Sequence, residues 1–315
     1  MIISASRRTD IPAYYAEWFF KRIRDAHVLV RNPVNLRQVS RIKLTPEVVD
    51  GIVFWTKDPT PMLDRLGELK DYTYYFQFTI TPYGKDIEPN IPPKNEAILT
   101  AFKKLSDMIG PDRIIWRYDP ILISEKYSAE YHLRAFAKIA GELHDYTRKV
   151  IISFIDEDYR TVKSNVKELA LSDFPAEKQI EIGSALSGIA KDYGLRIDTC
   201  AEEIDLEEYG IEHARCIDGR LFEKLLDCRL DIGKDRNQRP ECGCAASVDI
   251  GMYNTCLNGC RYCYANYNPK MVARNYARHD PLSPLLSGEI SAEDRVTERE
   301  MKSQRAGGWK CQQQL

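Results

Sequence analysis

The 315-residue chain lacks any apolar run long enough to cross a membrane or to serve as the core of a secretory signal. It also lacks an excess of charge of one sign, because 45 lysines and arginines face 47 aspartates and glutamates. A balanced charge gives no overall basic field to attract nucleic acid, although it does not exclude a local basic patch. We therefore expect a cytoplasmic protein with no membrane partner.

Familiar catalytic motifs are absent too. The sequence has no G-x-x-x-x-G-K-[ST] phosphate loop, no G-x-G-x-x-G fingerprint and no H-E-x-x-H zinc helix. The five histidines are scattered, and none is spaced for metal binding. Cysteine is missing from the first 199 residues, whereas nine cysteines follow between Cys200 and Cys311. Because cytosolic chains rarely keep disulfides, cysteines that cluster in this way favour metal binding or chemistry.

Short β-branched and aromatic runs alternate with helical patterns, which are clear at residues 14–24 and 97–109. This alternation predicts a parallel sheet with crossover helices, and eight repeats would close an α/β barrel of the (β/α)8, TIM-like type. The seventh strand is weak, so an open or partial barrel is the alternative. The expected strands are residues 2–4, 51–55, 74–80, 113–117, 150–155, 195–199, 214–217 and 247–250.

We expect one domain over residues 1–280 and a polar arm or tail over residues 281–315. Residues 28–44 depart from the alternation and are typical of an inserted β-hairpin that turns at Asn32-Pro33. Its cations form a basic flap, for which a solvated edge is favoured over a surface that holds an anionic substrate. These cations are Arg31, Arg37, Arg41 and Lys43.

Polar clusters follow several of the expected strands. In a parallel barrel the carboxyl ends of all strands converge on one face, where such enzymes build their sites. Polar loops and helix caps explain any single residue about as well, but the repeated pairing of arginine with aspartate favours a polar mouth. Members of these clusters are Arg7, Arg8, Asp10, Lys57, Arg117, Asp119 and Glu202.

The sharpest feature is a short loop with three cysteines, Cys256, Cys260 and Cys263. An iron–sulfur cubane is normally held by four thiolates, so a loop that supplies three leaves one iron open to another ligand. Gly259 lets such a loop curl without a Cβ clash. Structural zinc is the main alternative, but it usually takes paired cysteines, and only the nearby Cys242-Gly243-Cys244 could complete such a site.

At these residues the sequence resembles the radical S-adenosylmethionine (SAM) superfamily, whose cluster loop has this spacing and an aromatic residue before the last cysteine, here Tyr262. The resemblance implies that Cys256, Cys260 and Cys263 hold a [4Fe–4S] cluster, and that its open iron chelates the methionine part of SAM. It further implies reductive cleavage of SAM to a 5′-deoxyadenosyl radical, which abstracts hydrogen from a substrate. Tyr262 would lie near the adenine.

That superfamily carries its loop after the first strand, whereas here the loop follows the last expected strand. The first and last strands of a closed barrel are neighbours, so a circular permutation preserves every neighbour relation. Under this mapping residues 7–10 take the place that commonly contacts SAM. Asp10 would meet the SAM amino group, or Arg7 or Arg8 its carboxylate, although the usual Gly-Gly-Glu is absent.

The chain also resembles, over nearly its whole length, an uncharacterised bacterial family with the same C-terminal cysteine loop. Further shared features are the Ser-Arg-Arg-Thr-Asp stretch at residues 6–10 and the Asp-Ile-Gly-x-Tyr stretch at residues 249–253. This second resemblance implies no known reaction.

Four more cysteines are expected near strand ends, namely Cys200, Cys216, Cys242 and Cys244. They could hold a second, fully liganded iron–sulfur cluster that relays electrons or binds substrate, as auxiliary clusters do in some radical SAM enzymes. The alternative, with slightly more weight, is that they are buried thiols acting as small apolar side chains. Cys228 and Cys311 are interpreted as ordinary thiols.

The sequence therefore predicts a radical SAM enzyme on a circularly permuted barrel, with an electron donor such as flavodoxin or ferredoxin as its partner. The cofactor supplies the chemistry, while the protein aims it and excludes water. The alternative is a non-catalytic protein in which zinc or an iron–sulfur cluster staples the C-terminal segment, with the basic flap contacting nucleic acid. The candidates for substrate contacts are Lys57, Gln77, Arg117, Asp119 and Glu202.

Overall fold

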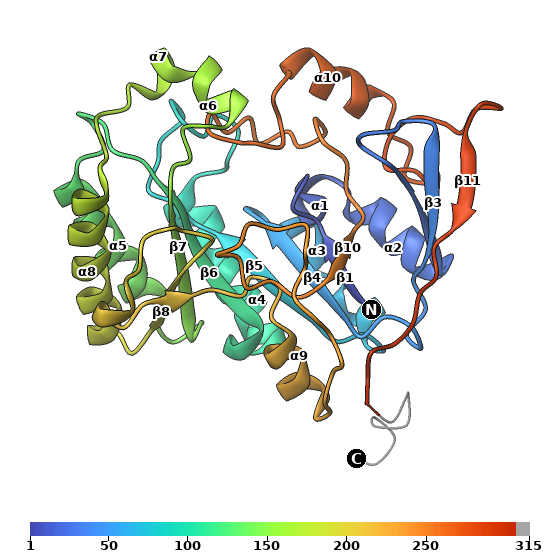
Figure 1. Ribbon diagram of the computed structural model, residues 1–315, viewed down its shortest axis with the longest axis horizontal. Coiled ribbons are helices and arrows are strands. Elements are labelled where there is room, and N and C mark those ends of the chain that lie inside the picture. The colour runs from blue at the N-terminus through green and yellow to red at the C-terminus, as the bar shows by residue number, and fades with distance from the viewer. Residues whose placement is uncertain (307–315) are drawn as a thin grey trace.

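The computed structural model describes residues 1–306, and its centre is an eight-stranded sheet in which all neighbouring strands run parallel (Figure 1). The last strand of this sheet in the sequence pairs with the first. In spatial order the strands are β10 (Ser247–Asp249), β1 (Ile2–Ala5), β4 (Gly51–Thr56), β5 (Tyr74–Thr79), β6 (Ile114–Ile121), β7 (Lys149–Phe154), β8 (Arg196–Thr199) and β9 (Glu212–His213). The predicted α/β fold with a parallel central sheet is thus confirmed.

The two edges of the sheet are its shortest strands, β9 with two residues and β10 with three. Within residues 1–306 no ladder joins these edges. The segments beside them nevertheless meet, because the Ala245 N–H donates to the carbonyl oxygen of Ile217 at 2.9 Å. Closure of the sheet into a circularly permuted barrel therefore stays a prediction.

The seventh strand differs from its expected position at residues 214–217. β9 ends at His213, and the chain then runs as a non-strand segment, Ala214, Cys216 and Ile217 being buried in the core. The apolar composition of residues 214–217 comes from their burial in the core and not from pairing in the sheet. A short buried segment has the same apolar composition whether or not it is a strand.

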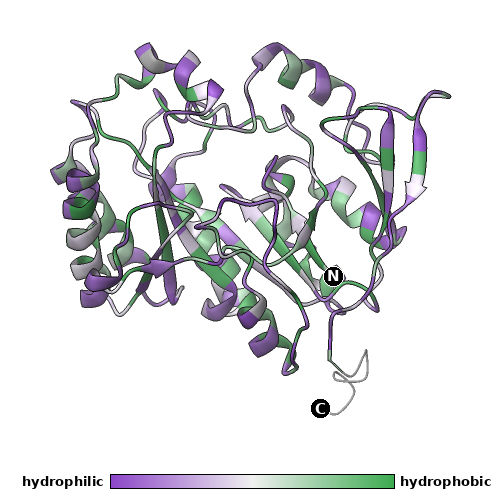
Figure 2. Ribbon diagram, in the orientation of Figure 1, coloured by the Kyte–Doolittle hydropathy of each residue, from purple (hydrophilic) through white to green (hydrophobic). Residues whose placement is uncertain are grey.

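Successive strand residues face opposite sides of the sheet, and the two sides have different coverings. On one side Ile3, Phe54 and Phe76 belong to the large core beneath the helices. On the other side Val53 and Tyr75 pack against the segment between β9 and β10, including α9. Figure 2 shows apolar residues gathered along the central strands and polar residues on the outward faces of the helices. The sheet is therefore buried on both faces, as expected of parallel strands.

Short and long helices connect the strands (Figure 1). The α-helices are α1 (Ile11–Tyr14), α2 (Ala16–Arg24), α3 (Thr60–Leu63), α4 (Leu99–Ile109), α5 (Ala129–Leu143), α6 (Arg160–Ser164), α7 (Val166–Leu169), α8 (Ala176–Asp192), α9 (Gly219–Leu226) and α10 (Pro269–Ala277). The short 3-10 helices are η1 (Leu66–Leu69), η3 (Pro111–Arg113) and η4 (Glu207–Tyr209), and η2 (Lys94–Ile98) is a π-helix. None of the described helices is long and apolar enough to span a membrane.

A second, three-stranded sheet lies at one side of the molecule (Figure 1). β2 (His27–Arg31) and β3 (Gln38–Lys43) pair antiparallel over the stretch where the hairpin is expected. β11 (Arg295–Glu298), from the expected polar arm, pairs in parallel with β3. The arm has no apolar pattern because most residues of β11 are exposed. β11 nevertheless forms, because the backbone N–H and C=O groups at the edge of β3 can pair with another strand. Cys311 and the end of the arm lie outside the described residues.

Candidate functional site

A cavity of about 460 Å³ opens at the carboxyl ends of the central strands. Its wall is made by the loops after β1, β4, β7 and β8, by the end of β6, and by the segments on both sides of β10. Of the predicted site residues only Gln77 is not on this wall. The others that line it are Arg7, Arg8, Asp10, Lys57, Arg117, Asp119, Cys200, Glu202, Cys216, Cys242, Cys244, Cys256, Cys260, Tyr262 and Cys263.

The loop that carries Cys256, Cys260 and Cys263 is held in shape by polar contacts to other segments. The side chain of Asn90 donates to the Leu257 carbonyl oxygen at 2.7 Å. Gly259 has φ +69°, and a Cβ there would lie 3.1 Å from the Asn90 amide nitrogen. The loop therefore needs glycine for both its backbone conformation and its close approach.

Asn258, a residue of this loop that the sequence did not single out, is a second anchor. Its side-chain oxygen accepts from the Tyr14 hydroxyl at 2.7 Å, and its nitrogen donates to Asp10 at 3.1 Å. Asp10 also accepts from the Lys57 N–H at 2.8 Å and caps α1 through the Ala13 N–H. Burial raises the pKa of Asp10 to about 6 despite these donors. The structure thus gives Asp10 a clear anchoring role, and its contact with SAM stays a prediction.

Asp249, at the end of β10, organises the loop that follows β1. Its carboxylate accepts from the hydroxyls of Ser4 at 2.8 Å and Ser6 at 2.7 Å, and from the Arg7 N–H at 2.8 Å. Sequence reasoning noticed this aspartate only as part of the 249–253 stretch. With its backbone fixed in this way, Arg7 brings its guanidinium within 3.6 Å of Asp235, and Arg8 lies 5.2 Å from the centre of the Tyr253 ring.

A buried carboxylate, Glu88, lies beside the cysteine loop and was missed by sequence reasoning. It accepts from Lys57 at 2.7 Å and forms ion-pair contacts with Lys94. The Tyr262 hydroxyl also donates to it. Burial opposes ionisation of Glu88, yet the two lysines outweigh burial and lower its pKa to about 2. The only sequence feature that could have pointed to Glu88 is its position in the loop after β5. Glu88 belongs to no recognisable motif, so sequence reasoning did not select it.

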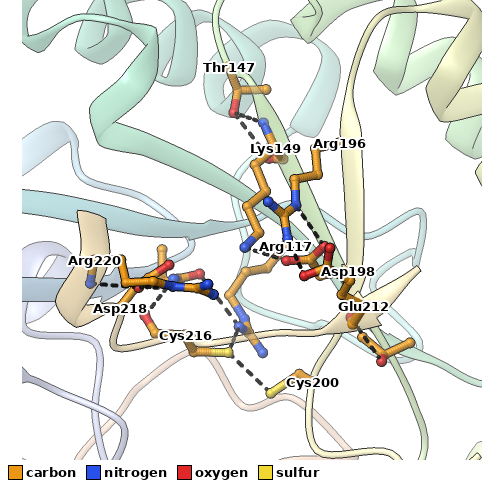
Figure 3. A network of polar contacts seen from close by, with 12 residues as sticks. Arg117, Thr147, Lys149, Arg196, Asp198, Cys200, Glu212, Cys216, Asp218 and Arg220 are labelled. Atoms are coloured by element: carbon orange, nitrogen blue, oxygen red, sulfur yellow. Dashed lines mark hydrogen bonds and ion pairs between the residues drawn. The ribbon is translucent and has the colours of Figure 1, made fainter. Parts of the chain in front are cut away.

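The four cysteines of the second group meet although they come from three segments. The sulfurs of Cys200 and Cys216 lie 3.2 Å apart. The Cys244 sulfur accepts from the Ile217 N–H at 3.4 Å, and all four cysteines line the cavity. Figure 3 shows Cys200 and Cys216 facing each other, with Arg117 reaching Cys216. All four thiols thus lie on one wall, and a second cluster on them stays a prediction.

The predicted substrate contacts fall into two kinds. Arg117 is buried; one of its nitrogens lies 2.9 Å from the Cys216 sulfur, and it pairs with Asp119. Gln77 is fully buried beneath the cavity and donates to the Cys216 carbonyl oxygen at 2.7 Å. Glu202 accepts from the Phe154 N–H at 2.9 Å, and burial raises its pKa to about 7. Gln77 thus supports the wall, while the others form part of it.

The donor set fits a soft metal centre better than a hard one. Seven thiols and no histidine line the cavity, and thiolates select iron–sulfur clusters, zinc or copper(I) over magnesium or calcium. Buried polar atoms without a partner also lie on its wall: Trp55 Nε1, Thr9 Oγ1 and Asn266 Oδ1. Among residues 1–306 no three metal-ligating side chains are already gathered around one ion-sized point. The residues present are therefore suited to hold a sulfur-liganded group.

Comparison with known proteins places the chain in a family. Residues 2–265 match the model of the family described as "Domain of unknown function (DUF1848)". Because this match covers most of the sequence, the chain belongs to that family. Its matched region includes the whole eight-stranded sheet and the cysteine loop. No curated protein matches the chain significantly.

Proposed function

We propose that this chain is a cytoplasmic radical SAM enzyme on a circularly permuted (β/α)8 barrel, with its substrate bound in the cavity at the strand ends. The observation that carries the proposal is the placement of Cys256, Cys260 and Cys263 on the wall of that cavity, next to the polar ends of parallel strands. A [4Fe–4S] cluster on these thiols would supply the reductive cleavage of SAM to a 5′-deoxyadenosyl radical.

The chain's own residues would hold SAM beside the cysteine loop. Arg7 and Arg8 are the cations on the wall closest in sequence to β1, and a guanidinium suits a carboxylate because it donates two parallel hydrogen bonds. Tyr262 reaches the wall while its hydroxyl is tied to Glu88, which fixes the ring for contact with the adenine. Lys57, whose side chain is 12% exposed, adds positive charge beside this loop.

The remaining wall would bind the substrate and exclude water. Asp119 and Glu202 present carboxyl groups, and Arg117 a guanidinium, so a polar substrate with hydrogen-bond donors and acceptors fits this surface. Trp55 places an apolar ring on the wall, 5.1 Å from the Arg117 guanidinium carbon. An electron donor of the flavodoxin or ferredoxin class completes the proposal.

Anaerobic purification and a SAM cleavage assay with a chemical reductant test this proposal. The wild-type protein should be brown, contain iron and sulfide, and release 5′-deoxyadenosine. Cys260→Ala should reduce 5′-deoxyadenosine to the background of the reductant alone. Cys228→Ala is the matched control, because Cys228 is outside the cavity wall, and it should keep both iron and activity.

A colourless wild-type protein with zinc and no SAM cleavage would reject the enzyme and support the non-catalytic alternative. Iron without SAM cleavage, unchanged by Cys260→Ala, would likewise contradict a cluster on the loop.

A further inference from the structure

We propose that Cys200, Cys216, Cys242 and Cys244 form a second metal centre of four thiolates, separate from the cysteine loop, that joins the two edges of the central sheet. Its ligand class is a soft metal, either one zinc ion or an iron–sulfur cluster, because four thiolates complete the coordination of both. This centre does not depend on the radical SAM proposal.

The backbone brings these cysteines together by specific hydrogen bonds. The Cys216 carbonyl oxygen accepts from the Tyr75 hydroxyl and the Gln77 amide of β5, each at 2.7 Å. Beside it, the Ile217 N–H donates to the Cys244 sulfur at 3.4 Å. The segments that carry Cys216 and Cys244 are thus aligned side by side over the inner face of the sheet.

The four cysteines share one cavity wall. The sulfurs of Cys200 and Cys216 are 3.2 Å apart, and the Cys244 sulfur accepts from the N–H of Ile217, the residue after Cys216. Four cysteines that serve only as apolar filling have no reason to meet one another on the wall of a cavity. A shared metal explains why thiols from three segments converge, because each thiolate then completes the same coordination shell.

Arg117 supplies a second, independent observation. Its side chain is 5% exposed, and one of its guanidinium nitrogens lies 2.9 Å from the Cys216 sulfur. Four thiolates around a divalent metal carry net negative charge, which a buried N–H donor stabilises, as outer hydrogen bonds do at other metal sites. We therefore assign Arg117 as a positioning residue of this centre, with Asp119 as its counter-charge.

The centre would also have a structural effect. β9 and β10 have only two and three residues, so few backbone hydrogen bonds secure the edges of the sheet. Cys200 follows β8, Cys216 follows β9, and Cys242 and Cys244 precede β10. A metal bound by all four would link the three segments and close the region between the two edges.

Metal analysis of full-length variants, purified without oxygen, tests this inference. We would measure iron, zinc and acid-labile sulfide per chain in the wild type and in two multiple variants. The first, Cys256→Ser with Cys260→Ser and Cys263→Ser, leaves the four cysteines intact and should retain one metal centre. The second, with all four cysteines of the proposed centre changed to serine, should lose that metal. Cys228→Ser is the control and should match the wild type.

The retained metal identifies the centre, since iron with about equal sulfide indicates a cluster and zinc without sulfide indicates a single ion. A loop variant with no metal, and with four thiols that react freely or form a disulfide, would overturn the inference. If the variant without the four cysteines does not fold, the metal content of the loop variant alone decides the inference. Failure of the radical SAM proposal would look different, because the loop variant would then hold the same metal as the wild type.

Discussion

The two cysteine groups share one cavity but are held there in different ways. The loop group lies within residues 256–263, and side chains such as Asn90 and Asn258 fix the loop through direct hydrogen bonds. The second group spans residues 200–244 and depends on how three separate segments pack over β5. A contiguous loop keeps its spacing through its local sequence, whereas the second group exists only once the sheet has formed.

The electrostatic settings of the two groups differ as well. Beside the loop, Glu88 is a buried carboxylate that faces two lysines, so the pair of cations exceeds its charge. Beside the second group, Arg117 and Asp119 form an ion pair whose charges cancel. Arg117 also donates a hydrogen bond to the Cys216 sulfur. Substitutions in these two settings should therefore separate the groups.

The largest effect is expected from Glu88→Gln. Lys57 and Lys94, whose side chains are 12% and 20% exposed, would lose their buried counter-charge, so the free energy of unfolding should fall by about 3–5 kcal/mol. Urea denaturation measures this, and iron analysis should show that loss from the loop exceeds loss from the second group. Glu96→Gln, on the exposed surface nearby, should change stability by less than about 0.5 kcal/mol. Equal effects of the two substitutions would contradict the assigned role of Glu88.

A somewhat smaller effect is expected from acid. The pKa of Glu88 is about 2 in the folded protein against an ordinary value of 4.5, so the unfolded chain binds the proton more tightly. Its stabilisation is fully present above pH 4.5 and should be lost as the pH falls towards 2. The loss should reach about 3 kcal/mol at most. Denaturation curves measured down the pH scale should show this limb in the wild type and a weaker one in Glu88→Gln.

Gln77→Leu should act on the second group alone, with a smaller effect. It removes one of two donors to the Cys216 carbonyl oxygen in a fully buried position, which should lower the free energy of unfolding by about 1–2 kcal/mol. Metal analysis of the loop variant combined with Gln77→Leu should show reduced occupancy of the second centre. Gln179→Leu loses a similar bond to the Phe174 carbonyl oxygen far from the cysteines and should leave the metal unchanged.

The smallest effect is expected from Cys228→Ala. This half-buried cysteine follows α9 and is not on the cavity wall, so neither group loses a member. The free energy of unfolding should change by less than about 1 kcal/mol, and the metal content should stay the same. A large loss of iron would show that the division into two groups leaves out a cysteine.

Much of the fold could be predicted from the sequence because buried parallel strands leave a simple pattern. The runs at residues 51–55 and 150–155 became β4 and β7 within one residue at each end. The run at residues 214–217 misled, because a buried segment outside the sheet has the same apolar composition as a short strand. The pairing of β11 with β3 left no pattern either, since its side chains mostly face solvent.

The candidate site divides in the same way. Cys256, Cys260 and Cys263 could be chosen from spacing alone, and Arg7 and Lys57 from their positions after strands. Glu88 and Asn258 could not, because a single carboxylate or amide in a loop carries no pattern until its buried partners are known. Gln77 was chosen as a site residue from its position in a strand. Its hydrogen bond to the Cys216 carbonyl oxygen shows instead that it supports the cavity wall from beneath.

The sequence by itself determined the parallel α/β class and the three-cysteine loop, because both depend on periodicity or spacing over short stretches of chain. Only the tertiary structure decided that seven cysteines share one wall, and that Glu88 is buried between two lysines. These facts join residues far apart in the chain. Their proximity follows from packing, which sets distances that local patterns do not contain.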